Sequence, residues 1–346
     1  LASTIQLLID QYKDTSKLML ILCGSSMSYM EDHVLAYKAP LYGRRTAQIK
    51  ILPFDFEETC HYFKNFTDEE KACVYGIVGG TPQYLLQMSD KLSIEDNIKN
   101  TFLNPNSALF EEPENLLKQE VREPALYNAI ITAIATGASR MSEISGKVGE
   151  STNICSAYVK NLSSLGIIEK ETPYGEKVSR KAIYSIADNM FRFWYRFVPE
   201  NNSVIARGAA DLAYKRIEPH LSDYMGKVFE EICKQYLWKQ LFSGECPVEF
   251  SSLGRWWGND PKEKCQTEID ILAEQDKNTA LFGECKWTNE KVDLGVLETL
   301  VKRSELFPYK NVHYYLFAKT GFTKGCIDRA SEMGNVNLVS YKDMLR

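Results

Sequence analysis

The sequence predicts a multidomain protein that combines α/β regions with α+β regions. Its 346 residues, 44% of them hydrophobic, are enough for two or three packed cores. Apolar residues follow helical spacing in some segments and form continuous or alternating strand-like runs in others. The order of these patterns changes along the chain. We therefore expect five regions, which cover residues 1–53, 54–118, 119–188, 189–221 and 222–346.

Composition narrows the classes of function. The formal net charge is −5, so any nucleic-acid binding has to come from local basic patches. The nine cysteines show no paired short spacing, which argues against a zinc ribbon or a disulfide framework. No apolar run approaches the roughly 20 residues of a membrane span, and no secretory signal opens the chain. We expect a cytoplasmic protein without a membrane partner.

The first region has the pattern of an open α/β sheet. Residues 3–12 follow helical spacing, and residues 18–23 form a continuous apolar run typical of a buried parallel strand. A second strand is predicted at residues 48–52. The first of these strands ends in a polar tip that contains Ser25 and Ser26, where such sheets place groups that contact ligands.

The second region is predicted to be helical, with helices at residues 56–63 and 69–78 and another that opens within residues 79–85. Residues 1–118 resemble the latter half of an archaeal-type AAA ATPase of the P-loop class, with a helical lid. The resemblance implies that Ser25 or Ser26 lies near the terminal phosphate of ATP. It also implies that Arg44 or Arg45 reaches nucleotide in the same or a neighbouring subunit of a homo-oligomer. The alternative is that both arginines are solvated loop residues.

The phosphate-binding loop of such an ATPase is missing from the sequence. No Gly-x-x-x-x-Gly-Lys-Ser/Thr motif occurs, so there is no backbone cradle for phosphates. We expect this chain to bind ATP weakly or not at all. It reads as the C-terminal portion of a longer ATPase, or as a truncated relative, and ATP would bind only to the full-length protein.

Residues 119–188 have the pattern of three helices followed by a β-hairpin. The helices are predicted at residues 126–136, 141–148 and 151–165, and the hairpin turns at residues 174–176. This order resembles a winged helix-turn-helix. The resemblance implies contacts between DNA and five residues of the third helix and the wing. They are Asn153, Lys160, Lys177, Arg180 and Lys181. Nearby glutamates offset much of this positive charge, so docking to a protein is the alternative.

The fourth region, residues 189–221, contains too many aromatic residues for a flexible linker. We expect it to pack between domains, with stacking on nucleic acid as the alternative.

The fifth region contains the strongest candidate chemistry. Residues 267–274 and 281–287 are strand-like and are joined by a short polar turn, which predicts an antiparallel hairpin. Glu284 and Lys286 then project from the same face, and Asp270 lies opposite them. A buried carboxylate pair needs a divalent cation or a proton between its members. The alternative is a solvated hairpin edge, although the flanking residues are apolar.

Another acid precedes this hairpin on a predicted amphipathic helix, residues 222–241, with Ser222 as its N-cap. Glu230 lies at the edge of the apolar face and can lean toward a sheet below, and Glu231 is the second choice. The remaining elements are a strand near 247–255 before the hairpin, then helix 294–306, strand 312–318, helix 325–333 and strand 336–339.

This order resembles the PD-(D/E)XK superfamily, whose restriction-endonuclease-like core is αβββαβ, over residues 222–340. The resemblance implies that Asp270, Glu284 and Glu230 surround Mg²⁺ or Mn²⁺, and that Lys286 orients or helps to deprotonate the attacking water. Ile269 stands where the superfamily motif has proline. A divalent ion and an ammonium group suit phosphodiester hydrolysis, because the reaction needs a hydroxide and neutralisation of phosphoryl charge.

The complete chain resembles a family of prokaryotic ATPases whose C-terminal part is uncharacterised. The resemblance implies an ATP-driven protein that acts on DNA through a winged helix and a metal-dependent nuclease domain. The alternative is a catalytically inactive nuclease fold that binds DNA or a partner protein.

Overall fold

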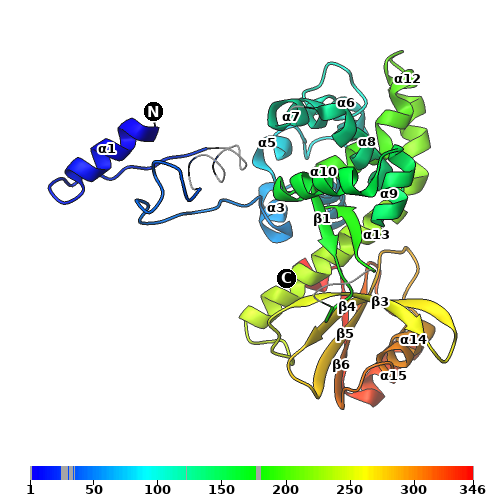
Figure 1. Ribbon diagram of the computed structural model, residues 1–346. Helices are drawn as coiled ribbons and strands as arrows, with labels where there is room; N and C mark the ends of the chain where they lie inside the picture. The colour runs from blue at the N-terminus through cyan, green and yellow to red at the C-terminus, as the bar shows by residue number, and fades with distance from the viewer. Residues whose placement is uncertain are drawn as a thin grey trace.

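The computed structural model describes residues 2–24, 30, 34, 36–121, 123–176 and 181–345. These residues form a mixed α/β structure in three parts (Figure 1). An N-terminal arm extends to one side, a group of helices forms the middle, and a five-stranded mixed sheet forms the C-terminal end. In the described part of the chain, no helix is long and apolar enough to cross a membrane.

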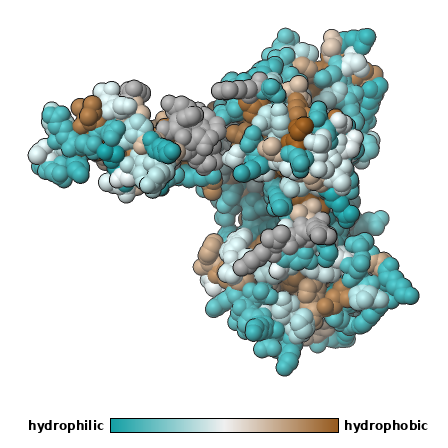
Figure 2. Space-filling model, in the orientation of Figure 1, coloured by the Kyte–Doolittle hydropathy of each residue, from teal (hydrophilic) through white to brown (hydrophobic). Residues whose placement is uncertain are grey.

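The N-terminal arm contains helix α1 (Ala2–Tyr12) but neither of the predicted strands. Residues 18–23 and 48–52 have no strand structure, so both strand predictions are wrong for the described chain. Met19 is 82% exposed and Ile51 is 90% exposed. Figure 2 shows the arm projecting away from the other parts, with much of its surface open to solvent. A strand needs a neighbour to accept and donate its backbone hydrogen bonds, and no described segment takes that place.

The next part is helical, as predicted. Two of its helices begin with reciprocal capping boxes, formed by Asp55 with Glu58 and by Thr67 with Glu70. A glycine is required after the second helix, because a Cβ atom on Gly80 would lie 1.8 Å from the carbonyl oxygen of Phe54. The helices are α3 (Phe56–Tyr62), α4 (Asp68–Val78), α5 (Pro82–Leu85), α6 (Ile94–Thr101) and α7 (Glu112–Glu120).

Three helices and a hairpin follow, in the predicted order. Ser151 caps the third helix by accepting a hydrogen bond from the backbone of Ile154, and Gly166 after it has a φ of +74°. The hairpin strands pair antiparallel, with Ile168 opposite Ile186. The elements are α8 (Pro124–Ala135), α9 (Met141–Val148), α10 (Thr152–Ser164), β1 (Ile168–Glu171) and β2 (Ile183–Ile186).

The aromatic segment, which was expected to pack between domains, packs between helices. It forms α11 (Asn189–Phe197), η2 (Pro199–Asn201) and α12 (Asn202–Ile205). Phe193 is completely buried, and the indole of Trp194 donates a hydrogen bond to the carbonyl oxygen of Phe110 at 2.6 Å. Helix α11 contacts both α4 and α8. It therefore joins helices α3–α7 to the module formed by α8–β2.

The predicted helix at residues 222–241 is part of a longer one, α13 (Ala210–Phe242), which has 33 residues. Ser222 is therefore inside the helix, and its prediction as N-cap is wrong. Pro219 lies within the helix without ending it, although proline usually breaks a helix. Tyr224 of α13 donates a hydrogen bond to the carbonyl oxygen of Gly76 at 2.6 Å, and Phe229 packs on Trp287. This helix thus connects the middle helices with the sheet (Figure 1).

The sheet is built from β3 (Leu253–Asp260), β4 (Cys265–Glu274), β5 (Thr279–Lys286), β6 (Asn311–Ala318) and β7 (Val336–Ser340), in that order. β3, β4 and β5 pair antiparallel, whereas β5, β6 and β7 pair parallel. The strand predicted near residues 247–255 starts later, at Leu253, so its predicted position is wrong.

Helices cover both faces of this sheet. Buried residues of α13 pack on one face together with Leu281 and Phe317. On the other face, α14 (Leu294–Ser304) and α15 (Lys324–Met333) cover Phe282 and Leu316. A short η3 (Asp343–Leu345) ends the described chain. Strand alternation therefore divides the hydrophobic residues between two cores.

Candidate functional site

The predicted hairpin places Asp270 next to Glu284. β4 and β5 pair antiparallel from Ile271 opposite Gly283 to Glu274 opposite Ala280. Just beyond this pairing, the carboxylate of Asp270 accepts a hydrogen bond from the backbone nitrogen of Cys285 at 2.9 Å. Asp270 is 7% exposed and Glu284 is 6% exposed. Two acidic side chains are therefore buried side by side, which is unusual unless their charge is compensated.

A β-bulge sets the position of Asp270. The register between β3 and β4 shifts by one residue, so Asp270 and Ile271 together lie opposite the single residue Arg255. A bulge of this kind changes the direction in which a side chain points and is common next to active sites.

Two cations compensate Glu284. The Nζ atom of Lys286 is 2.7 Å from its Oε1, and a guanidinium nitrogen of Arg303 on α14 is 3.3 Å from its Oε2. The neighbouring position of Lys286 agrees with the prediction from strand spacing. Arg303 was not predicted, because a basic residue in the last turn of a helix is common for reasons of helix stability alone.

Burial governs the ionisation of this site. It raises the pKa of Asp270, and the hydrogen bond from Cys285 partly offsets that effect. Burial also raises the pKa of Glu284, the charge of Asp270 raises it further, and Lys286 lowers it. Burial disfavours the charged form of Lys286, but Glu284 and Asp270 raise its pKa overall. Lys286 is therefore an ammonium group at neutral pH.

Glu230 approaches the pair from helix α13, as predicted. Burial raises its pKa, which Lys227 lowers and Asp270 raises. Its Oε2 atom is buried, has no hydrogen-bond partner and lies 3.6 Å from the Nζ of Lys227. Glu231 instead pairs with Lys234 at 3.6 Å, and its side chain is 51% exposed. Of the two acids, Glu230 is the one that is directed toward the site.

The donor atoms suit a hard divalent cation, because carboxylate oxygens are the usual protein ligands of Mg²⁺ and Mn²⁺. The Oε2 atom of Glu230 is buried without a hydrogen-bond partner, which supports this fit. Within the described residues, however, no three His, Cys, Asp or Glu side chains converge as a set of metal ligands. Lys286 and Arg303 supply the positive charge at Glu284. A bound ion would have to displace these two contacts.

Two of the four residues predicted to contact nucleotide, Arg44 and Arg45, can be placed, and they lie in the N-terminal arm. Ser25 and Ser26 fall outside the described residues. Arg44 forms an ion pair with Asp10 of α1 at 2.7 Å, and Arg45 donates a hydrogen bond to Gln48. Both arginines therefore bind side chains within the N-terminal arm.

Three of the residues predicted to contact DNA can be placed. Asn153 and Lys160 are exposed on α10, and Lys181 is exposed two residues before β2. The Nζ of Lys181 is 3.1 Å from Glu176. Lys177 and Arg180 lie outside the described residues.

These features define a mixed α/β protein with a five-stranded mixed sheet and a buried carboxylate pair. Residues 194–297 match the model of the DUF234 family, which is described as archaeal and bacterial proteins of unknown function. The matched span runs from α11 into α14 and includes all four predicted catalytic residues. They are Glu230, Asp270, Glu284 and Lys286.

An uncharacterised protein of Methanocaldococcus jannaschii is 35% identical to this chain over 291 residues. The aligned part is 84% of this chain and 64% of that relative, so the chain spans less than two thirds of the relative's length. No solved structure matches the chain.

Proposed function

We propose that residues 222–346 form a PD-(D/E)XK-type phosphodiesterase domain that cleaves DNA with Mg²⁺ or Mn²⁺. One observation carries this proposal. Asp270 and Glu284 are buried side by side on adjacent strands, and Lys286 contacts Glu284. Burying two acids costs free energy, so their presence in a core is better explained by chemistry than by stability.

In this proposal Asp270, Glu284 and Glu230 hold the cation. A divalent ion bound there would supply a hydroxide near neutral pH and neutralise charge on the phosphate. Lys286 is held protonated by the neighbouring carboxylates, so its role is to stabilise negative charge and orient water. Arg303, which now contacts Glu284, would contact a phosphate oxygen once it is released.

We also propose that the chain is the C-terminal portion of an ATP-dependent, AAA-type protein. The length of the archaeal relative supports a longer parent protein. Ser25, Ser26, Arg44 and Arg45 would contact ATP only in that protein, where the ATPase part would form a homo-oligomer. The α8–β2 module would bind DNA through α10, whose Asn153 and Lys160 are exposed.

A second candidate function has its own supporting observation. Lys286 and Arg303 already compensate Glu284, and no three ligands converge within the described residues. A catalytically inactive nuclease fold that binds DNA or a protein would keep this charge-compensated arrangement permanently.

A cleavage assay separates the two functions. We would incubate the full chain with single-stranded, double-stranded or branched DNA in the presence of Mg²⁺ or Mn²⁺. Cleavage by the wild type should fall at least about 100-fold in Asp270→Asn and Lys286→Met. Glu332→Gln, which changes an exposed acid paired with Arg329, is the matched control and should cleave normally. Intact DNA in all wild-type reactions would favour the inactive module.

A further inference from the structure

The β1–β2 hairpin of the α8–β2 module contacts the five-stranded sheet near the buried Asp270 and Glu284. The backbone nitrogen of Tyr174 donates a hydrogen bond to the carbonyl oxygen of Arg255 at 2.9 Å. Its hydroxyl accepts a hydrogen bond from the backbone nitrogen of Glu274 at 3.1 Å. The segment that follows β1 therefore lies against both β3 and β4. Figure 1 shows the hairpin reaching down from the helices to these strands.

Glu171, the last residue of β1, is directed at helix α13. Its Oε2 atom is 3.8 Å from the Nζ of Lys227, and its Oε1 atom is 3.9 Å from the Nζ of Lys234. These lysines are seven residues apart, so they occupy one face of the helix. The side chains of Glu171 and Lys234 are only 17% and 12% exposed, so solvent screens this contact less than it screens a surface ion pair.

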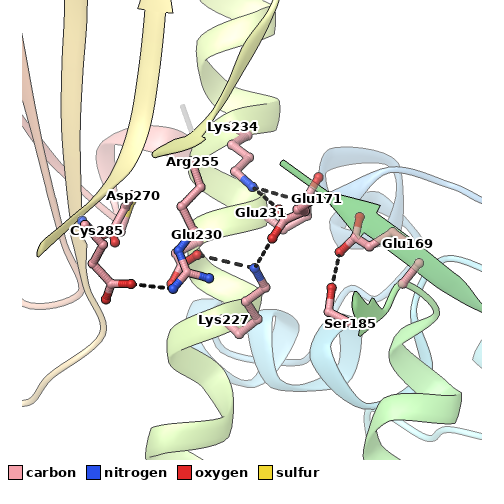
Figure 3. A network of polar contacts seen from close by, with 12 residues as sticks. Glu169, Glu171, Ser185, Lys227, Glu230, Glu231, Lys234, Arg255, Asp270 and Cys285 are labelled. Carbon is pink, nitrogen blue, oxygen red and sulfur yellow. Dashed lines mark hydrogen bonds and ion pairs between the residues drawn. The ribbon is translucent and has the colours of Figure 1, made fainter. Parts of the chain in front are cut away.

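Lys227 links the hairpin to the candidate site. Its Nζ is 3.6 Å from the Oε2 of Glu230 and 3.8 Å from the Oε2 of Glu171, and neither oxygen has a hydrogen-bond partner. Figure 3 shows Lys227 with contacts to Glu171 on one side and Glu230 on the other. The two carboxylates therefore compete for one ammonium group.

We propose that Glu171 is a positioning residue for the candidate site, and this inference rests on the proposed function. By attracting Lys227, Glu171 keeps that ammonium from closing fully on Glu230, so an oxygen of Glu230 stays available for a cation near Asp270. Through the hairpin, the cation affinity of the site thus depends on the position of the α8–β2 module.

Removing the charge of Glu171 should lower the affinity of the site for a divalent cation in two ways. In Glu171→Gln, Lys227 keeps Glu230 as its nearest carboxylate and moves toward it. The region around the site also loses one negative charge. Both effects weaken divalent-cation binding, and we expect the Kd for Mn²⁺ to rise about tenfold, as for other residues that orient metal ligands.

The chain offers a matched control on the same strand. Glu169 is two residues before Glu171, and its Oε1 accepts a hydrogen bond from the hydroxyl of Ser185 at 2.8 Å, within the hairpin. Glu169→Gln makes the same chemical change in the same hairpin but leaves the contacts of Glu171 with α13 in place. Glu171→Asp keeps the charge and should restore most of the affinity.

The experiment measures two signals from the full chain. Electron paramagnetic resonance follows Mn²⁺ binding, and NMR of protein with ¹³C-labelled glutamate carboxyl groups follows Glu230, whose signal Glu230→Gln identifies. We expect Glu171→Gln to weaken Mn²⁺ binding and to shift the Glu230 signal without added metal. Glu169→Gln should change neither.

An unchanged Glu230 signal in Glu171→Gln would overturn the inference, whatever Mn²⁺ does. Absence of Mn²⁺ binding by the wild type would instead contradict the proposed function, and the carboxyl signal would still decide whether Glu171 acts on Glu230. Equal melting temperatures of Glu171→Gln and Glu169→Gln would separate positioning from loss of folding.

Discussion

The C-terminal sheet and the N-terminal arm contain similar apolar runs with opposite outcomes. In the sheet, Phe282 on β5 and Leu316 on β6 are completely buried, and each strand pairs with its neighbours. In the arm, residues 18–23 and 48–52 remain unpaired, with Ile51 90% exposed. An apolar run therefore shows a tendency to be buried, but neighbouring strands and covering helices decide whether a strand forms.

The two regions also differ in how they are covered by other elements. The two runs in the arm stay exposed, whereas helices cover both faces of the sheet that carries Asp270 and Glu284.

We expect the largest difference in the free energy of unfolding between two variants in which a side chain is truncated to alanine, one in the sheet and one in the arm. Phe282→Ala empties a buried position and should lower the free energy of unfolding by about 3–5 kcal/mol. Ile51→Ala changes an exposed residue and should alter it by less than about 0.5 kcal/mol. Urea unfolding followed by tryptophan fluorescence reports on the sheet and the adjoining helices, because all five tryptophans lie within residues 194–287. Equal losses in both variants would mean that the arm is packed.

A smaller effect, of about 1 kcal/mol, is expected from Asp270→Asn. Burial raises the pKa of Asp270 above its ordinary value of 3.8, so the protonated form is favoured in the folded protein. The stability due to this group is therefore fully present below pH 3.8 and is lost as the pH rises through the folded pKa. The charge of Glu268 also raises the pKa of Asp270, whereas the hydrogen bond from the backbone of Cys285 and the charges of Lys286 and Arg255 lower it.

Asparagine carries no charge and can still accept the hydrogen bond from Cys285. The variant should therefore gain stability relative to the wild type between pH 4 and pH 8, as measured by urea midpoints. A difference that does not change with pH would contradict this account of the buried charge. The exposed control Glu332→Gln should show no such gain.

We expect the smallest change in stability from a substitution in the N-terminal arm. Solvent screens the ion pair between Arg44 and Asp10, so Arg44→Gln should leave the urea midpoint essentially unchanged. Calorimetry with ATP should detect weak binding or none in both proteins, since the chain has no phosphate-binding loop. Tight ATP binding by this chain would contradict that interpretation.

Local sequence patterns predicted much of the fold and the core of the site. The β4–β5 hairpin follows from period-two spacing and a short polar turn, and it brings Asp270, Glu284 and Lys286 together. The start of α13 at Ala210 was missed because Pro219 lies inside the helix. Arg303 and Glu171 were missed because their contacts join residues far apart in the chain, and spacing carries no signal for such contacts.

We propose that the buried carboxylates hold a divalent cation, and anomalous diffraction from crystals soaked in Mn²⁺ can show whether they do. We expect one manganese peak between Asp270 and Glu284, within reach of Glu230, with Lys286 and Arg303 turned away from Glu284. Crystals of Asp270→Asn should lack the peak. No peak at this position in the wild type, with the contacts of Lys286 and Arg303 to Glu284 unchanged, would contradict the claim.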